Sequence, residues 1–220
     1  MLLSMNVIEL FSSIDGEGKR QGFLTTFLRL HDCNIRCSYC DTLYSYGPES
    51  TFESMSVQAV ADVIEQLENH RITITGGEPL LQEPAIIELI DELTRRNARY
   101  DFNIETNGTI IPSFHRDNVW FTYDYKTPSS LAEDAMNLDI FKVATPADII
   151  KFVVGSMQDL DRMDEILKTY PTDAQIFVSP VWGNIEGATI VDYMKAHNWQ
   201  NVRFQLQIHK FIWDPDAKGV

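Results

Sequence analysis

Segments with strand-like and helix-like patterns alternate along most of this chain of 220 residues. Runs rich in β-branched and aromatic residues are separated by runs whose apolar residues recur at helical spacing. Ser56 is a potential cap for the run at residues 57–67, and Ser156 opens the run that ends at residue 170. Such alternation predicts an α/β fold with a mostly parallel sheet. The expected strands are residues 7–14, 25–30, 71–75, 100–105, 119–123, 148–154, 175–179 and 202–208. The expected helices lie within residues 57–67, 86–93, 156–170 and 190–194.

All three cysteines of the chain lie close together, as Cys33, Cys37 and Cys40 in a C-x3-C-x2-C spacing. Thiolates are the ligands that zinc and iron-sulfur clusters prefer. Structural zinc takes four protein ligands, and a 4Fe-4S cluster used only for electron transfer takes four cysteines. Three cysteines would leave one iron of a 4Fe-4S cluster open to another ligand. The alternative is a zinc site that uses His31 or Asp41 as its fourth ligand.

Composition and charge narrow the classes of function. The chain is 44% hydrophobic and 23% charged, which is typical of a globular protein, and its length fits a single domain over residues 1–220. The net charge of -14 argues against the basic surface that phosphate backbones require, so we expect no nucleic-acid partner. We see no signal-like N-terminus and no apolar run long enough for a membrane span, and therefore expect a cytoplasmic protein without membrane association.

Glycine and polar residues gather where the expected strands end, at residues 15–22, 76–79, 105–108 and 124–130. In parallel α/β folds these ends meet at one face, where ligands bind. Loops of this composition can also be plain solvated turns.

A lysine, Lys151, interrupts the apolar run of residues 149–154. A buried ammonium needs an anion or a polar cavity. Lys151 therefore points either into the mouth of the fold or to a solvated edge. The same two interpretations apply to Lys126, and Asp124 beside it favours the functional one.

The cysteine spacing resembles the cluster motif of the radical S-adenosylmethionine (radical SAM) enzymes. In that superfamily the open iron binds the amino and carboxylate groups of S-adenosylmethionine. An electron from the cluster then cleaves the sulfonium, which yields methionine and a 5′-deoxyadenosyl radical that abstracts a substrate hydrogen. Residues 76–79, Gly-Gly-Glu-Pro, resemble the motif for the amino group. The resemblance implies a radical SAM core, a partial TIM barrel of about six parallel strands with helices.

Within the superfamily, four features are similar to the 7-carboxy-7-deazaguanine synthase (QueE) family: residues 16–18, 27–29, 40–42 and 205–210. That family contracts 6-carboxy-5,6,7,8-tetrahydropterin to 7-carboxy-7-deazaguanine and releases ammonia, in the biosynthesis of queuosine and related 7-deazapurines. The resemblance implies a C–N lyase whose cofactors are a 4Fe-4S cluster, S-adenosylmethionine and Mg2+.

The resemblance also assigns residues. It implies catalytic roles for Glu17, Arg29 and Lys126, and cluster ligation by the three cysteines. Arginine suits a substrate carboxylate because its planar fork contacts both oxygens. The implied substrate contacts are Ile14, Asp15, Gly16, Glu17, Arg29, Thr75, Gln207 and His209. The implied S-adenosylmethionine contacts are Tyr39, Gly77, Glu78, Glu105, Asn107, Asp124, Tyr125, Lys126 and Lys151.

The resemblance places Mg2+ at Thr42, where a hard cation would bridge the threonine oxygen to the pterin carboxylate. The alternative is a threonine that only hydrogen-bonds its own loop. The sequence departs from the family pattern in two places. Asp15 stands where glutamine is usual, and residues 124–126 are Asp-Tyr-Lys where Ser-Pro-Lys is usual.

Two other functions also fit the cysteine motif. A glycyl-radical activase would use the same cluster on a protein substrate, and a zinc-stabilised binding module would have no chemistry. For the enzyme we expect a homodimer, with an electron donor such as flavodoxin or ferredoxin.

Overall fold

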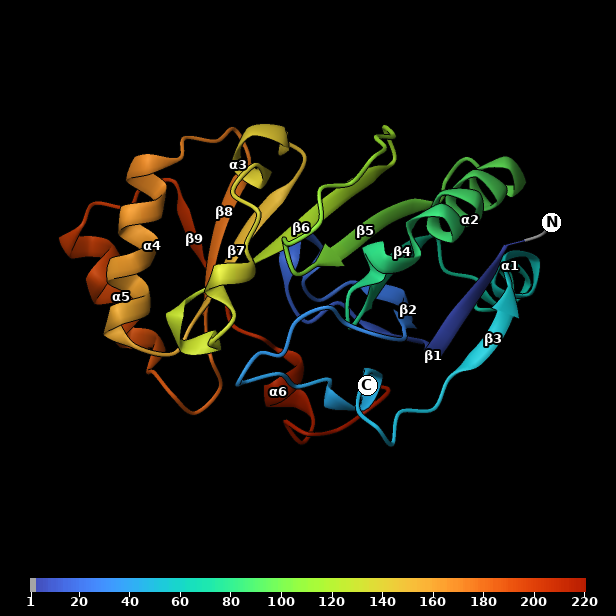
Figure 1. Cartoon of the computed structure of the whole chain (residues 1–220), viewed down its shortest axis with the longest axis horizontal. Coiled ribbons are helices and arrows are strands. Elements are labelled where there is room, and N and C mark those ends of the chain that lie inside the picture. The colour runs from blue at the N-terminus through green and yellow to red at the C-terminus, as the bar shows by residue number, and fades with distance from the viewer. Residues whose placement is uncertain (1–2) are drawn as a thin grey trace.

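One sheet runs through the computed structural model, which describes residues 3–220. Its strand order is β3-β1-β2-β4-β5-β6-β7-β8-β9 (Figure 1). The strands are β1 (Ser4–Ile14), β2 (Leu24–Leu30), β3 (Glu53–Ser56), β4 (Arg71–Gly76), β5 (Asp101–Thr106), β6 (Val119–Lys126), β7 (Ile149–Val154), β8 (Gln175–Pro180) and β9 (Val202–Phe204). The α-helices are α1 (Val57–Gln66), α2 (Glu83–Arg96), α3 (Ile140–Val143), α4 (Met157–Thr169), α5 (Gly187–Ala196) and α6 (His209–Ile212).

The expected parallel arrangement is confirmed for seven strands, which pair in parallel in the order β2-β4-β5-β6-β7-β8-β9. The first strand, β1, instead pairs antiparallel with both β2 and β3. The short loop between β1 and β2 permits only a hairpin, because a parallel connection needs a longer crossover. Since β3 and β9 are the two edges of the sheet, the barrel is partial and open.

Two strand predictions differ from the structure. The edge strand β3 was not expected, because its sequence, Glu-Ser-Met-Ser, lacks the β-branched and aromatic residues that mark strands. The predicted strand 202–208 is wrong beyond Phe204. There Gln205 turns its side chain to the loop after β1, where it accepts a hydrogen bond from Gly18 N at 2.7 Å and donates one to Gly18 O at 2.9 Å.

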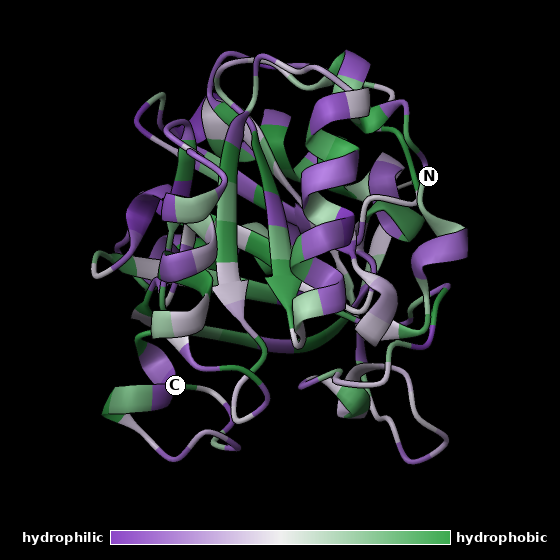
Figure 2. Ribbon diagram, turned by 90° about the vertical axis from the view of Figure 1, so that its left-hand side faces the viewer, coloured by the Kyte–Doolittle hydropathy of each residue, from purple (hydrophilic) through white to green (hydrophobic). Residues whose placement is uncertain are grey.

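Helix starts follow the predicted caps. The Ser56 side chain accepts a hydrogen bond from Ala59 N at the start of α1, and Ser156 accepts one from Asp159 N at the start of α4. Figure 2 shows apolar residues concentrated along the strands and polar residues on outward faces of the helices. Within residues 3–220, no helix combines the length and apolar character needed to cross a bilayer.

Strand alternation separates two environments. On β6, Phe121, Tyr123 and Tyr125 belong to the apolar core, whereas Asp124 and Lys126 line a cavity on the inner face. Alternation therefore directs these polar side chains of β6 to the cavity, and the parallel strand order brings the carboxyl ends of neighbouring strands to the same edge.

Candidate active site

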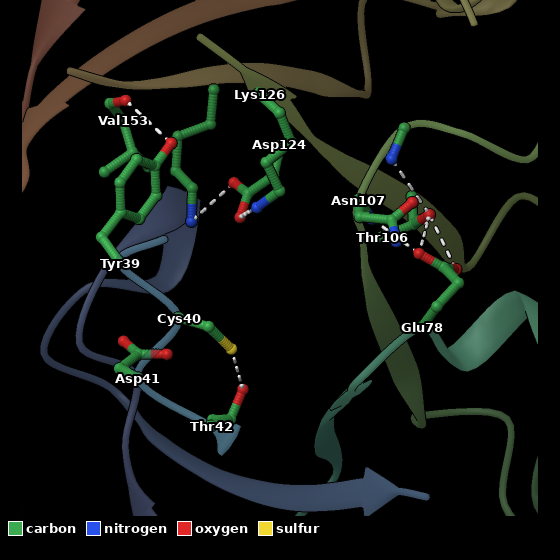
Figure 3. A network of polar contacts seen from close by, with 12 residues as sticks. Tyr39, Cys40, Asp41, Thr42, Glu78, Thr106, Asn107, Asp124, Lys126 and Val153 are labelled. Atoms are coloured by element: carbon green, nitrogen blue, oxygen red, sulfur yellow. Dashed lines mark hydrogen bonds and ion pairs between the residues drawn. The ribbon is translucent and has the colours of Figure 1, made fainter. Parts of the chain in front are cut away.

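A cavity opens at the carboxyl ends of the parallel strands. Its walls come from the loop after β1, the cysteine loop, the ends of β4 to β7, the segment after β8 and the C-terminal segment. In Figure 3, residues 39–42 of the cysteine loop lie on one side of the opening, with Asp124 and Lys126 above and Asn107 opposite. Segments far apart in sequence therefore surround one space.

The three cysteines all line this cavity. Asn107 donates its side-chain amide to Cys33 Sγ at 3.7 Å, and Cys40 Sγ lies 3.6 Å from Thr42 Oγ1. A Cβ on Gly77 would overlap the backbone carbonyl of Asp32. The glycine therefore lets the end of β4 approach the cysteine loop closely.

The ligands of the zinc alternative do not converge on the thiols. His31 packs its ring against Phe52 with centroids 4.4 Å apart and is not among the lining residues. Asp41 lines the cavity but pairs with Lys210 at 3.5 Å. In the described part of the chain, no group of three or more His, Cys, Asp and Glu side chains is arranged to hold a single ion.

Glu78 is fully buried and does not line the cavity. Its carboxylate accepts a hydrogen bond from Leu80 N at 2.9 Å. It also accepts hydrogen bonds from Thr106 Oγ1 at 2.9 Å and Asn107 N at 2.7 Å (Figure 3). The carboxylate thus holds the loop after β5 and sets the position of Asn107. The prediction that Glu78 contacts S-adenosylmethionine directly does not match this placement, because its oxygens face protein groups.

A chain of ion pairs crosses the cavity. Lys151 Nζ lies 2.8 Å from Glu17 Oε1 and 2.9 Å from Asp124 Oδ1, and Asp124 Oδ2 pairs with Lys126 at 3.2 Å. The solvated-edge alternative for Lys151 is wrong, since its side chain is only 5% exposed and lines the cavity. Burial alone would lower the pKa of Lys151, but Asp124 and Glu17 raise it well above its usual value. The lysine therefore stays charged.

Two further carboxyl groups of the cavity hold protons unusually well. Burial raises the pKa of Asp15 to about 6 against the opposing charge of Arg20 and a 3.2 Å hydrogen bond from Thr73. Burial raises the pKa of Glu105 to about 8, opposed by Lys151. At neutral pH Glu105 is mostly protonated and can donate a hydrogen bond to a ligand.

Arg29 lines the cavity on the side of the hairpin β1–β2. Its Nε donates to Glu9 Oε2 at 2.9 Å, and Tyr44 donates its hydroxyl to the same oxygen at 3.1 Å. Glu9 and Tyr44 were not identified from the sequence. The inward alternation of β1 could have singled out Glu9, which is opposite Arg29 in the antiparallel register.

The C-terminal segment forms one wall of the cavity. Gln207 Nε2 lies 3.5 Å from Glu17 Oε2, and Ile208 N donates to Gly16 O at 3.0 Å. A Cβ on Gly16 would overlap the His209 ring, so only glycine permits this packing. The segment therefore brings both predicted residues, Gln207 and His209, to the loop after β1.

The remaining predicted residues divide between the cavity and the core. Those that line the cavity are Ile14, Tyr39, Thr42 and Thr75. Tyr125 does not line it: its hydroxyl donates to Glu133 at 2.8 Å and its ring packs on Phe152. Alternation along β6 turns this side chain to the opposite face, and the contact of Tyr125 with S-adenosylmethionine stays a prediction.

Comparisons with known proteins agree with this geometry. A family profile described as the Radical SAM superfamily matches residues 29–153. The protein of Clostridium acetobutylicum named 7-carboxy-7-deazaguanine synthase is 38% identical over 223 residues, which cover 99% of this chain and 100% of the relative. The protein of that name from Methanospirillum hungatei is 37% identical, with 96% and 86% covered. The crystal structure of QueE from Escherichia coli has a TM-score of 0.70 at 22% identity and covers 92% of this chain and 93% of that one.

Proposed function

This chain belongs to the 7-carboxy-7-deazaguanine synthase family of the radical SAM superfamily, and from this membership we propose that it converts 6-carboxy-5,6,7,8-tetrahydropterin to 7-carboxy-7-deazaguanine and ammonia. The observation that carries the proposal is one cavity lined by all three thiols of the chain and by Arg29. The relatives that match along the whole chain favour this reaction over a glycyl-radical activase or a zinc-stabilised module.

The cavity fits the cofactors of the superfamily. Cys33, Cys37 and Cys40 would supply three ligands of a 4Fe-4S cluster, and with no fourth cysteine in the chain one iron would remain for S-adenosylmethionine. When bound, the cluster supplies the electron that starts the radical chemistry of S-adenosylmethionine. The close approach at Gly77 and the amide of Asn107 on Cys33 support a cluster at this position.

For S-adenosylmethionine we propose contacts from residues that line the same cavity: Tyr39, Gly77, Glu105, Asn107, Asp124, Lys126 and Lys151. Asp124 and the two lysines form a fixed pattern of alternating charge that suits a ligand with both an ammonium and a carboxylate. Glu78 takes part by holding the loop of Asn107.

For the pterin we propose that the Arg29 guanidinium takes the carboxylate. Glu17, Asp15, Thr75, Gln207, His209 and the backbone from Ile14 to Gly16 line the rest of the pocket. Glu17 is held in place by Lys151 at 2.8 Å, and its second oxygen lies near Gln207. A carboxylate fixed in this way can orient an N–H group of the substrate and accept a proton from it.

We also propose that Mg2+ binds at Thr42, which lines the cavity beside Asp41. Hydroxyl and carboxylate oxygens are the ligands that this hard cation prefers. The Thr42 hydroxyl is directed at Cys40, a contact compatible with the alternative of a purely local role. The proposal also includes a homodimer and an electron donor such as flavodoxin or ferredoxin. It includes a cytoplasmic location, because the thiols must stay reduced to bind iron.

The proposal is tested by anaerobic incubation of iron-reconstituted protein with dithionite, S-adenosylmethionine and 6-carboxy-5,6,7,8-tetrahydropterin. We expect 7-carboxy-7-deazaguanine and ammonia in equal amounts, measured by mass spectrometry and an ammonia assay. Cleavage of S-adenosylmethionine without ring contraction would show that the substrate is another molecule. A colourless protein that binds zinc but no iron would contradict the whole assignment.

A further inference from the structure

Arg29 is already engaged on one edge before any substrate binds. Among residues 3–220, its ion pair is with Glu9, whose Oε2 accepts from Arg29 Nε at 2.9 Å. Both side chains are only partly exposed, Arg29 at 15% and Glu9 at 20%, and Arg29 lines the cavity. The terminal Nη groups of Arg29 are the part of the guanidinium left for a ligand.

Two features fix the position of Glu9. Glu9 and Arg29 are opposite each other in the antiparallel register of β1 and β2, just after an irregularity between Val7 and Glu9. Cross-strand partners share one face of the sheet, and a bulge changes the direction of the side chain that follows it. The second feature is the Tyr44 hydroxyl, which donates to the same carboxylate oxygen at 3.1 Å.

Tyr44 connects this pair to the cluster loop. It follows Thr42 by two residues, and its ring lies under the Arg29 guanidinium with a centroid distance of 5.8 Å. The guanidinium is planar, and its N–H groups have fixed directions. Holding Nε therefore fixes the direction of the Nη edge relative to the cysteines.

From these contacts we propose that Glu9 is a positioning residue: it holds the Nε edge of Arg29 so that the Nη edge meets the carboxylate of the substrate. The proposal rests on the function proposed above and assigns a residue that the family resemblance did not. The charge of Glu9 opposes the attraction of Arg29 for an anion, so Glu9 contributes orientation at some cost in attraction. This opposition distinguishes a positioning role from a purely attractive one.

Substitution of Glu9 separates orientation from charge. In Glu9→Ala the guanidinium loses its anchor, and we expect the dissociation constant of 6-carboxytetrahydropterin to rise about tenfold, the effect of one hydrogen bond to a charged group. Glu9→Gln keeps an oxygen for Arg29 and Tyr44 but removes the negative charge, so its affinity should equal or exceed that of the wild type. Tyr44→Phe should weaken binding by about threefold, because the Glu9–Arg29 contact survives.

The decisive comparison uses a second ligand, tetrahydropterin without the carboxylate. Dissociation constants are measured by anaerobic titration of the iron-reconstituted protein with S-adenosylmethionine and no reductant. Glu9→Ala should bind this analogue as the wild type does, and kcat with saturating carboxylated substrate should change much less than KM. Glu53→Ala is the matched control, since Glu53 is exposed on the neighbouring strand β3 and lies outside the cavity.

Three outcomes would overturn the proposal. They are unchanged affinity in Glu9→Ala, equal loss of both pterins, and a Glu9→Gln variant as weak as Glu9→Ala. If Glu9→Ala loses iron or S-adenosylmethionine affinity, the Glu9→Gln and Tyr44→Phe results decide. Failure of the wild type to convert the carboxylated pterin would instead contradict the proposed function.

Discussion

Each of the two ends of the barrel interior holds an arginine, Arg20 buried and Arg29 partly buried, and the two are bound differently. At the amino ends of the strands, Arg20 pairs with Asp101 at 2.9 Å, donates to Ile72 O at 3.1 Å and stacks on Trp120. At the carboxyl ends, Arg29 is held at its Nε edge by Glu9 and lines the open cavity. The Arg20 guanidinium therefore contacts protein groups, whereas Arg29, held at its Nε edge, can receive a ligand at its Nη edge. We call the region around Lys19, Arg20 and Trp120 the closed end and the region around Arg29 the open end.

The difference shows that buried charge alone does not mark a functional site. Arg20 and Lys19 both lie over the Trp120 ring, and Lys19 also bonds the carbonyl of Ala147. At the closed end, the charged groups of Arg20 and Lys19 therefore contact other groups of the protein. At the open end, Arg29 is held in place by Glu9 and still lines the cavity. Substitutions at the closed end should therefore change stability, and substitutions at the open end should change ligand binding and chemistry.

The largest effect is expected from the cysteines. Cys33→Ala, Cys37→Ala and Cys40→Ala should each abolish activity and lower the iron content, because each removes one ligand from a cluster with no spare cysteine. Iron analysis and anaerobic turnover are the measurements. Full S-adenosylmethionine cleavage by any of the three variants would refute the ligand assignment.

Arg29→Lys tests the open end without removing its charge. The ammonium cannot form a bidentate contact, so substrate affinity should fall roughly ten- to a hundredfold. S-adenosylmethionine affinity and the midpoint of thermal unfolding should stay near wild type, as isothermal titration and circular dichroism would report. Equal loss of both ligands would assign Arg29 a folding role instead.

Arg20→Met tests the closed end. It keeps most of the apolar stem but removes the ion pair with Asp101 and the contact with Trp120, so we expect a loss of about 2–3 kcal/mol in unfolding free energy. Denaturant unfolding under anaerobic conditions measures the change. The dissociation constants of the folded variant for both ligands should match wild type, and a selective loss of substrate affinity would break the contrast between the two ends.

The raised pKa of Glu105 predicts that the free energy of unfolding depends on pH. Burial raises its folded-state pKa to about 8 from an ordinary value near 4.5. Between these values the folded state holds a proton that the unfolded state has released, so this group favours folding at low pH and the benefit is lost as pH rises through 8. The unfolding temperature should drop more from pH 6 to pH 8.5 in the wild type than in Glu105→Gln, and equal drops would contradict the raised pKa.

The smallest effect concerns Thr42. If Mg2+ binds there, activity of chelated enzyme should rise when Mg2+ is added. Thr42→Val keeps the shape and removes the oxygen, so it should blunt this response while iron content and S-adenosylmethionine affinity stay near wild type. An unchanged response in the variant would refute the metal assignment.

The sequence alone determined the features that depend on local pattern. Apolar periodicity and capping serines predicted the parallel sheet and the starts of α1 and α4, and the cysteine spacing with residues 76–79 predicted the cluster loop and its neighbour. The sequence did not predict β3, because its four residues carry no strand signal and the strand forms by pairing with β1.

Only the tertiary structure decided which side chains meet. Lys151 and Glu17 are 134 residues apart in the chain, and no local pattern shows that they form an ion pair. The strand register places Glu9 beside Arg29, and the path of the cluster loop brings Tyr44 to the same carboxylate. Strand alternation turns the Tyr125 side chain away from the cavity. Spacing along a chain constrains the conformation of neighbouring residues, whereas contacts between distant segments depend on how the whole sheet packs.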